Sequence, residues 1–141
     1  MAYKVAVVGA TGNVWREMLS VLAERQFPVS EVVALASTRS VGTEVSFGDS
    51  ILKIKALDYF DFKGTDICLM SAGGAISKEW SPRIAAQGAI VIDNSSAWRM
   101  DRQVPLVVCR YSPCVAAAPR PREPHPRHRV GSRCLQSAYG R

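Results

Sequence analysis

The segment KVAVVGATGNVWREM (residues 4–18) constrains the fold more than any other part of the sequence. A short apolar, β-branched run leads into a glycine turn, and a helix-like segment follows. Gly9 permits a tight turn, and Gly12 lets the backbone approach a bound anion. Backbone N–H groups of such a turn, together with the helix N-terminus, suit a pyrophosphate. The alternative is an ordinary strand-to-helix turn with no ligand.

Trp15 stands where the third glycine of such a turn normally allows close contact between helix and strand. An indole cannot provide that contact. We therefore expect Trp15 either to displace the helix or to rotate outward. Whether the turn still binds a phosphate is a separate question from whether the scaffold forms.

Residues 1–108 alternate strand-like and helix-like segments. Near-continuous Val, Ile, Leu and Ala in the strand-like runs favour a parallel sheet covered on both faces. The predicted fold class is a doubly wound, Rossmann-like α/β domain. The expected strands are residues 3–9, 31–37, 51–57, 65–74 and 89–97. The expected helices are 14–25, with Val14, Met18, Val21 and Leu22 on its buried stripe, and 77–88, with Ser77 as N-cap and Gly88 as the stop.

Small and polar residues recur at the ends of four expected strands, in the motifs GATGN, STRS, SAGG and DNSSAWR. Ligands of parallel α/β sheets bind at the carboxyl ends of the strands. We therefore expect the four motifs to form one pocket at the same rim. The small side chains of SAGG would let a flat ring or a phosphate lie against the backbone, unless its glycines serve packing alone.

The end of the second expected strand favours NADP over NAD. An acid normally receives the ribose hydroxyl of NAD at this position, but no acid lies between Glu31 and Glu44. Ser37, Arg39 and Ser40 instead form a set suited to a phosphate. The alternative is a solvated loop arginine.

Arg99, in DNSSAWR, suits a substrate anion such as phosphate. The alternative is an ion pair between Arg99 and either Asp93 or Asp101. Cys68 lies inside an apolar strand and is expected to be a packed small hydrophobe, not a nucleophile.

Residues 109–141 differ in composition from the rest of the chain. The first 108 residues carry equal numbers of basic and acidic side chains, so the whole net charge of +6 falls in this tail. Its Pro and Arg density and lack of hydrophobic period predict disorder. The tail could hold nucleic acid by charge alone, without specificity. Its cysteines and histidines match no usual zinc spacing, namely Cys109, Cys114, His125, His128 and Cys134.

No apolar run approaches the roughly 18 residues of a membrane span. The N-terminal apolar segment is too short for a signal peptide and runs directly into the glycine turn. We therefore expect a cytoplasmic protein without a membrane partner.

Five motifs resemble aspartate-semialdehyde dehydrogenases in order and spacing: VAVVGATGNV, LASTRSVG, SAGGAISKEW, VIDNSSAWRMD and VPLVV. The resemblance covers the N-terminal, nucleotide-binding part of that family, over residues 3–108. It implies NADPH-dependent reduction of β-aspartyl phosphate to aspartate semialdehyde, with phosphate as the other product, in lysine, threonine and methionine biosynthesis. It also implies a homodimer when the enzyme is full-length.

The resemblance further implies roles for individual residues. Around the cofactor pyrophosphate would lie Thr11, Gly12, Asn13 and Val14. The 2′-phosphate would contact Arg39 and Ser40, and the nicotinamide end would lie near Ser71, Ala72 and Gly73. Arg99 would bind the substrate phosphoryl group, and no metal is implied.

The sequence departs from the family after residue 108. The family's nucleophilic cysteine follows in an NC[ST] motif, which does not occur here, and its second domain would supply the acid/base histidine. We therefore assign no catalytic residue and expect the chain alone to be inactive. The change at Cys109 resembles a GC-rich gene read out of frame, and a glycine codon becomes the Trp15 codon by one base. The alternatives are an N-acetyl-glutamyl-phosphate type of reductase or a non-catalytic nucleotide-binding or nucleic-acid-binding protein.

Overall fold

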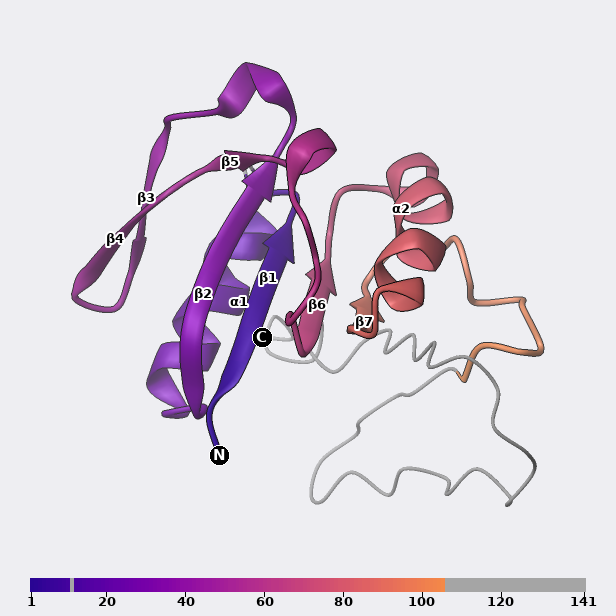
Figure 1. Cartoon of the computed structure of the whole chain (residues 1–141), viewed down its shortest axis with the longest axis horizontal. Coiled ribbons are helices and arrows are strands. Elements are labelled where there is room, and N and C mark those ends of the chain that lie inside the picture. Colours follow the sequence, from indigo (N-terminus) through magenta and orange to yellow (C-terminus); the bar gives the residue numbers. More distant parts are fainter. Residues whose placement is uncertain (11, 106–141) are drawn as a thin grey trace, which may run out of the picture.

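The computed structural model describes residues 1–10 and 12–105 (Figure 1). Its main strands and helices alternate along the chain as the apolar pattern predicts. In chain order the elements are β1 (Tyr3–Val8), α1 (Asn13–Glu24), β2 (Val29–Ala36), the 3₁₀ turn η1 (Thr38–Ser40), β3 (Glu44–Phe47), β4 (Ser50–Lys53), β5 (Lys55–Ala56), the 3₁₀ turn η2 (Leu57–Tyr59), β6 (Ile67–Met70), α2 (Gly74–Ala86) and β7 (Ile90–Asp93).

Five strands form one parallel sheet in the order β5-β2-β1-β6-β7. The last residues of the central strands lie level with one another, because Val8 pairs with both Leu35 and Met70, and Met70 pairs with Asp93. The carboxyl ends of these strands therefore meet at one rim. This arrangement confirms the predicted doubly wound α/β fold.

Both faces of the sheet are covered, as expected. Val5 and Val7 of β1 pack into the cluster that contains Met18 of α1. The alternate residues Ala6 and Val8 join a second cluster with residues of α2 and η2. Figure 1 shows α1 behind β1 and β2, and α2 beside β7. Residues 5–8 of β1 are thus buried regardless of the face to which they point, which is why this part of the strand is apolar throughout.

The buried stripe of α1 differs from the predicted one. Val14 is 46% exposed, whereas Trp15, Met18 and Leu19 are buried. The indole carries much more apolar area than a valine, so the orientation that buries Trp15 is favoured over the one that buries Val14.

The predicted start of the second helix is wrong. α2 begins at Gly74, with Gly73 at the N-cap position, so Ser77 lies within the helix and is fully buried. Its hydroxyl bonds to the Asp93 carboxylate and not to a helix N–H group. The predicted stop is confirmed, because the helix ends at Ala86 and Gly88 adopts a φ of +103°.

Two antiparallel strands, β3 and β4, form a hairpin in a region expected to be a loop followed by one strand. Val45 of β3 is buried in the cluster that contains Met18 of α1. The expected strand 51–57 is divided at the buried Ile54 between β4 and β5. Only β5 joins the main sheet, where it forms the edge beside β2.

Candidate functional site

A pocket of about 500 Å³ opens at the carboxyl rim of the sheet. Five predicted site residues line it together: Gly9, Gly12, Ser37, Ser71 and Ala72. The remaining lining residues are Val8, Ala36, Leu57, Asp58, Ile76 and Trp80. Three of the four predicted motifs thus meet in one cavity. Arg99, from the fourth motif, does not line it.

Gly9 lies where the end of β1 approaches the end of β6. Its φ is +97°, and a Cβ built at this position would lie 2.6 Å from the carbonyl oxygen of Ser71. The N–H groups of Gly9 and Ala10 both donate to the carbonyl of Leu35, at 3.0 and 3.1 Å. The turn therefore needs glycine here both for its conformation and for the close approach of β1 to the end of β6.

The N-terminus of α1 faces the same cavity through its cap residue, Gly12. Among the described residues, no side-chain hydrogen bond caps this end of the helix, and its first turn holds no acid. The N–H groups of a helix's first turn lack partners within the helix, so an anion can take that place. Asn13 and Val14 begin the helix and are exposed, but they do not line the pocket. Thr11 lies outside the described residues.

The segment predicted to bind the 2′-phosphate follows β2 and contains the 3₁₀ turn η1. Ser37 lines the pocket, Ser40 is partly buried, and Arg39 is exposed. The two ion pairs among residues 1–10 and 12–105 are Lys4–Glu31 and Glu79–Arg83, so the Arg39 guanidinium has no carboxylate partner there. The segment therefore carries a positive charge without a carboxylate partner among the described residues, but Arg39 and Ser40 do not line the cavity.

The turn after β6 forms the wall opposite η1. Ser71 donates its N–H to the carbonyl of Val8 at 3.0 Å, which fixes it against the glycine turn. Ala72 lines the pocket, and Gly73, with a φ of +89°, turns the chain into α2. Because these residues are small, backbone atoms lie close to the surface of this wall of the pocket.

Arg99 follows β7 and is partly buried. Within the described part of the chain it pairs with neither Asp93 nor Asp101, and its buried Nε has no hydrogen-bond partner. The predicted alternative, a structural ion pair with one of these aspartates, is therefore wrong.

A buried polar network joins β7 to α2. Asp93 accepts hydrogen bonds from the Ser77 hydroxyl and, at 2.6 Å, from the Ser95 N–H. The Trp98 indole N–H donates to Ser77 Oγ at 2.8 Å, and Ser81 Oγ lies 3.2 Å from the same oxygen. Asp93 thus fixes the segment that leads to Arg99. The sequence analysis noted Asp93 only as a possible ion-pair partner.

Cys68 is fully buried in β6, as predicted for a packed hydrophobe. Burial, and secondly the charge of Asp93, raise the pKa of its thiol to about 12. The thiol is therefore protonated at neutral pH, and only the thiolate is nucleophilic.

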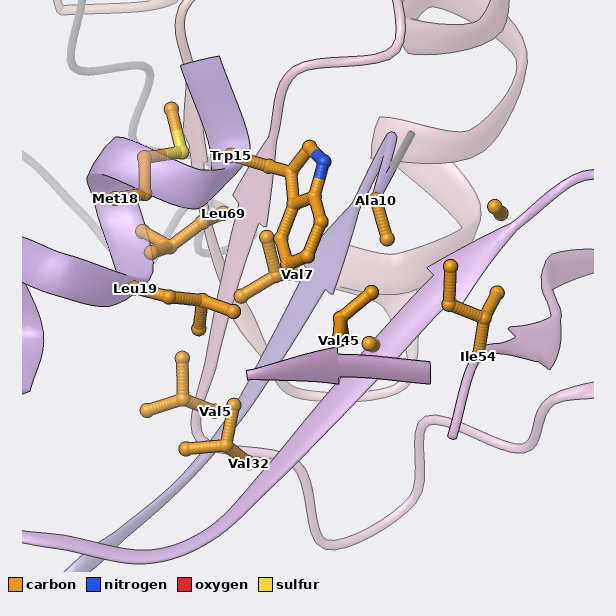
Figure 2. Packing of buried hydrophobic residues seen from close by; sticks show 12 residues of the cluster. Val5, Val7, Ala10, Trp15, Met18, Leu19, Val32, Val45, Ile54 and Leu69 are labelled. Carbon is orange, nitrogen blue, oxygen red and sulfur yellow. The ribbon is translucent and has the colours of Figure 1, made fainter. Parts of the chain in front are cut away.

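Trp15 is 2% exposed and packs in the cluster beneath the glycine turn, so the predicted outward rotation is wrong. Figure 2 shows the indole beside Val7, with its nitrogen on the side of Ala10. That Nε1–H group is buried and has no hydrogen-bond partner among residues 1–10 and 12–105. An unpaired buried donor costs roughly 1–3 kcal/mol, so the site accommodates this residue at the expense of stability.

The expectations that the chain has no metal site and no membrane span concern different parts of it. The five tail cysteines and histidines, like the predicted tail disorder, lie outside the described residues. Within residues 1–10 and 12–105, no three His, Cys, Asp or Glu side chains gather as a metal site would need. Neither described helix is long and apolar enough to cross a bilayer.

A parallel sheet, a glycine turn before a helix and a pocket at the carboxyl rim together are typical of the class of dinucleotide-binding domains. The family profile described as semialdehyde dehydrogenase, NAD binding domain, matches residues 4–116. The chain belongs to this family.

Curated relatives agree with the resemblance seen in the motifs. The chain is 56% identical over 114 residues to an aspartate-semialdehyde dehydrogenase of Aquifex aeolicus, covering 80% of this chain and 34% of the relative. It is 52% identical over 106 residues to the corresponding protein of Rickettsia conorii, covering 75% and 31%. The chain thus spans about a third of the length of these relatives.

Solved structures show the same fold. The structure of aspartate semialdehyde dehydrogenase II complexed with ASA from Vibrio cholerae superposes with a TM-score of 0.75 at 44% identity, covering 77% of this chain and 35% of that one. A Candida albicans enzyme with NADP superposes with a TM-score of 0.57 at 21% identity, covering 76% and 33%, and supports the fold alone.

Proposed function

We propose that the chain is the NADP-binding part of an aspartate-semialdehyde dehydrogenase. The complete enzyme would reduce β-aspartyl phosphate with NADPH to aspartate semialdehyde and phosphate. The observation that carries the cofactor choice is Arg39, which lies on η1 two residues after the pocket-lining Ser37 and has no carboxylate partner in the described chain. The relatives, and the ASA named with the Vibrio cholerae structure, support the substrate.

The described residues fit such a cofactor. The uncapped N-terminus of α1 and the open backbone at Gly12 would receive the pyrophosphate. Arg39, with Ser37 and Ser40, would bind the 2′-phosphate by charge-assisted hydrogen bonds. A bound cofactor would supply the hydride. Ser71, Ala72 and Gly73 would flank its nicotinamide end.

Arg99 would hold the substrate phosphoryl group, because its guanidinium has no carboxylate partner in the described chain. We assign no catalytic residue in this chain, since the Cys68 thiol is buried and protonated. The resemblance places the nucleophile and the acid/base histidine in other segments of the enzyme. The domain boundary at 108, the homodimer and the cytoplasmic location remain proposals.

Arg39→Ala tests the cofactor choice. We expect NADP affinity to fall by about 10- to 100-fold, because a hydrogen bond to a charged group contributes roughly 1.5–3 kcal/mol. NAD, which lacks the 2′-phosphate, should bind both proteins equally. Titration of both dinucleotides by calorimetry measures this. Arg25→Ala, an exposed arginine that follows α1 away from the pocket, is the control. An equal loss for NAD and NADP would contradict the 2′-phosphate role.

Trp15→Gly tests the third position of the glycine turn. We expect the variant to bind NADP up to about tenfold more tightly, because a glycine lets the start of α1 approach β1 closely. It should also unfold more easily, because removal of the buried indole leaves a cavity that costs roughly 3–5 kcal/mol. Removal of the indole also removes the unpaired Nε1–H group. Parallel NADP titrations of the two proteins give the result, and equal affinities would show that the indole leaves the phosphate site intact.

A further inference from the structure

A strand end that the four motifs did not include also contributes to the pocket. β5 runs parallel to β2 with Ala56 opposite Ala36, so η2 begins at Leu57 beside Ser37. Leu57 and Asp58 both line the cavity. The parallel pairing of this two-residue edge strand thus brings a carboxylate to the binding rim.

We infer that Asp58 recognises the adenine base of the cofactor by accepting a hydrogen bond from its 6-amino group, an inference that rests on the proposed function. Apolar side chains from two elements line the same cavity as Asp58. Leu57 comes from η2, whereas Ile76 and Trp80 come from α2. Ile76 is 37% exposed, and a flat aromatic ring seated in the pocket would cover it.

The chemistry of a carboxylate selects the amino group. An ionised Asp only accepts hydrogen bonds, and the adenine 6-amino group only donates them. Within the described part of the chain, no ion pair involves the Asp58 side chain. A hypoxanthine base carries a carbonyl oxygen at the same position and would place two acceptors opposite each other.

The charge of Arg39 indicates which part of the adenosine each of the two side chains would bind. Arg39 lies on η1, directly after β2, and would attract the 2′-phosphate. A carboxylate turned toward that phosphate would be repelled by it, because like charges at short range oppose binding. Asp58 therefore serves the base, and Arg39 serves the ribose phosphate. The pocket would thus read both ends of the adenosine moiety with opposite charges.

The experiment compares NADP with its hypoxanthine counterpart, in which a carbonyl replaces the 6-amino group and N1 carries a hydrogen. We expect the unchanged 141-residue protein to prefer NADP by about three- to tenfold, the contribution of one partly exposed hydrogen bond. Asp58→Asn should remove most of this preference, because an amide can both donate and accept. Asp58→Ala should remove it by weakening NADP binding. Asp49→Asn, an exposed acid outside the pocket, has the same charge change and should keep the preference.

The outcomes separate this inference from the proposed function. NADP binding with the same preference in all four proteins would overturn the role of Asp58 and leave the cofactor assignment standing. Failure of the unchanged protein to bind either dinucleotide would overturn both. Melting temperatures of the variants within about a degree of the unchanged protein would show that the effect is on binding.

Discussion

Gly9→Ala is expected to lower the free energy of unfolding by about 4 kcal/mol, since a strained backbone costs roughly 1–3 kcal/mol and overpacking a similar amount. The φ of +97° is unfavourable for any L side chain. The added Cβ would also meet the Ser71 carbonyl oxygen at 2.6 Å and the Ala72 nitrogen at 3.0 Å. These are backbone atoms, so the end of β6 would have to move away from β1. Urea denaturation of both proteins measures the loss.

Gly12→Ala is the matched control in the same turn. Gly12 has a φ of −94°, and an added Cβ would find only the Gly9 carbonyl oxygen, at 4.0 Å. Its stability should therefore change by less than about 1 kcal/mol, the usual size of a cap substitution. Its NADP affinity should fall, because the methyl group would occupy the space in front of the helix N-terminus. Equal stability of the two alanine variants would show that β1 and β6 do not need the close approach.

Asp93→Ala is expected to lower the free energy of unfolding by roughly 2–4 kcal/mol, because each buried donor left without a partner costs about 1–3 kcal/mol. Asp93 is fully buried and accepts from both Ser77 and Ser95. Without it, α2 and the segment leading to Arg99 lose their common anchor. A melting temperature lower by roughly 10–25 °C would follow, at 4–8 °C per kcal/mol for a domain of this size.

Two variants bracket this result. Asp93→Asn keeps an acceptor for the Ser95 N–H and should lose about half as much stability. Asp49→Ala removes an exposed acid in the β3–β4 hairpin and should leave the melting temperature nearly unchanged. If the Asp93→Ala and Asp49→Ala variants had the same melting temperature, the network would not anchor β7 to α2.

Sequence patterns predicted the sheet and its rim well, because both depend on local features. Buried parallel strands must be apolar on both faces, so β1, β2 and β6 are evident in the sequence. Small residues mark the points at which these strands end. Parallel direction alone then brings Gly9, Ser37 and Ser71 to one cavity. Residue roles in cofactor binding remain predictions.

Patterns were less reliable where several arrangements satisfy the same local rule. Val14 and Trp15 are adjacent apolar residues at the start of one helix, and periodicity could not choose between them. Ser77 has the chemistry of an N-cap, but its hydroxyl has a buried carboxylate to bond. In both cases a partner distant in sequence decided the outcome.

The sequence by itself determined the order of the main parallel strands and of the two helices, the position of the glycine turn and the absence of an acid after β2. Those features follow from side-chain size, charge and backbone freedom at single positions. Only the tertiary structure decided that Trp15 is buried, that Asp93 binds Ser77, and that Asp58 reaches the pocket. Each of these depends on which segments pack together, and that choice minimises the exposed apolar area of the whole domain and not of any one element.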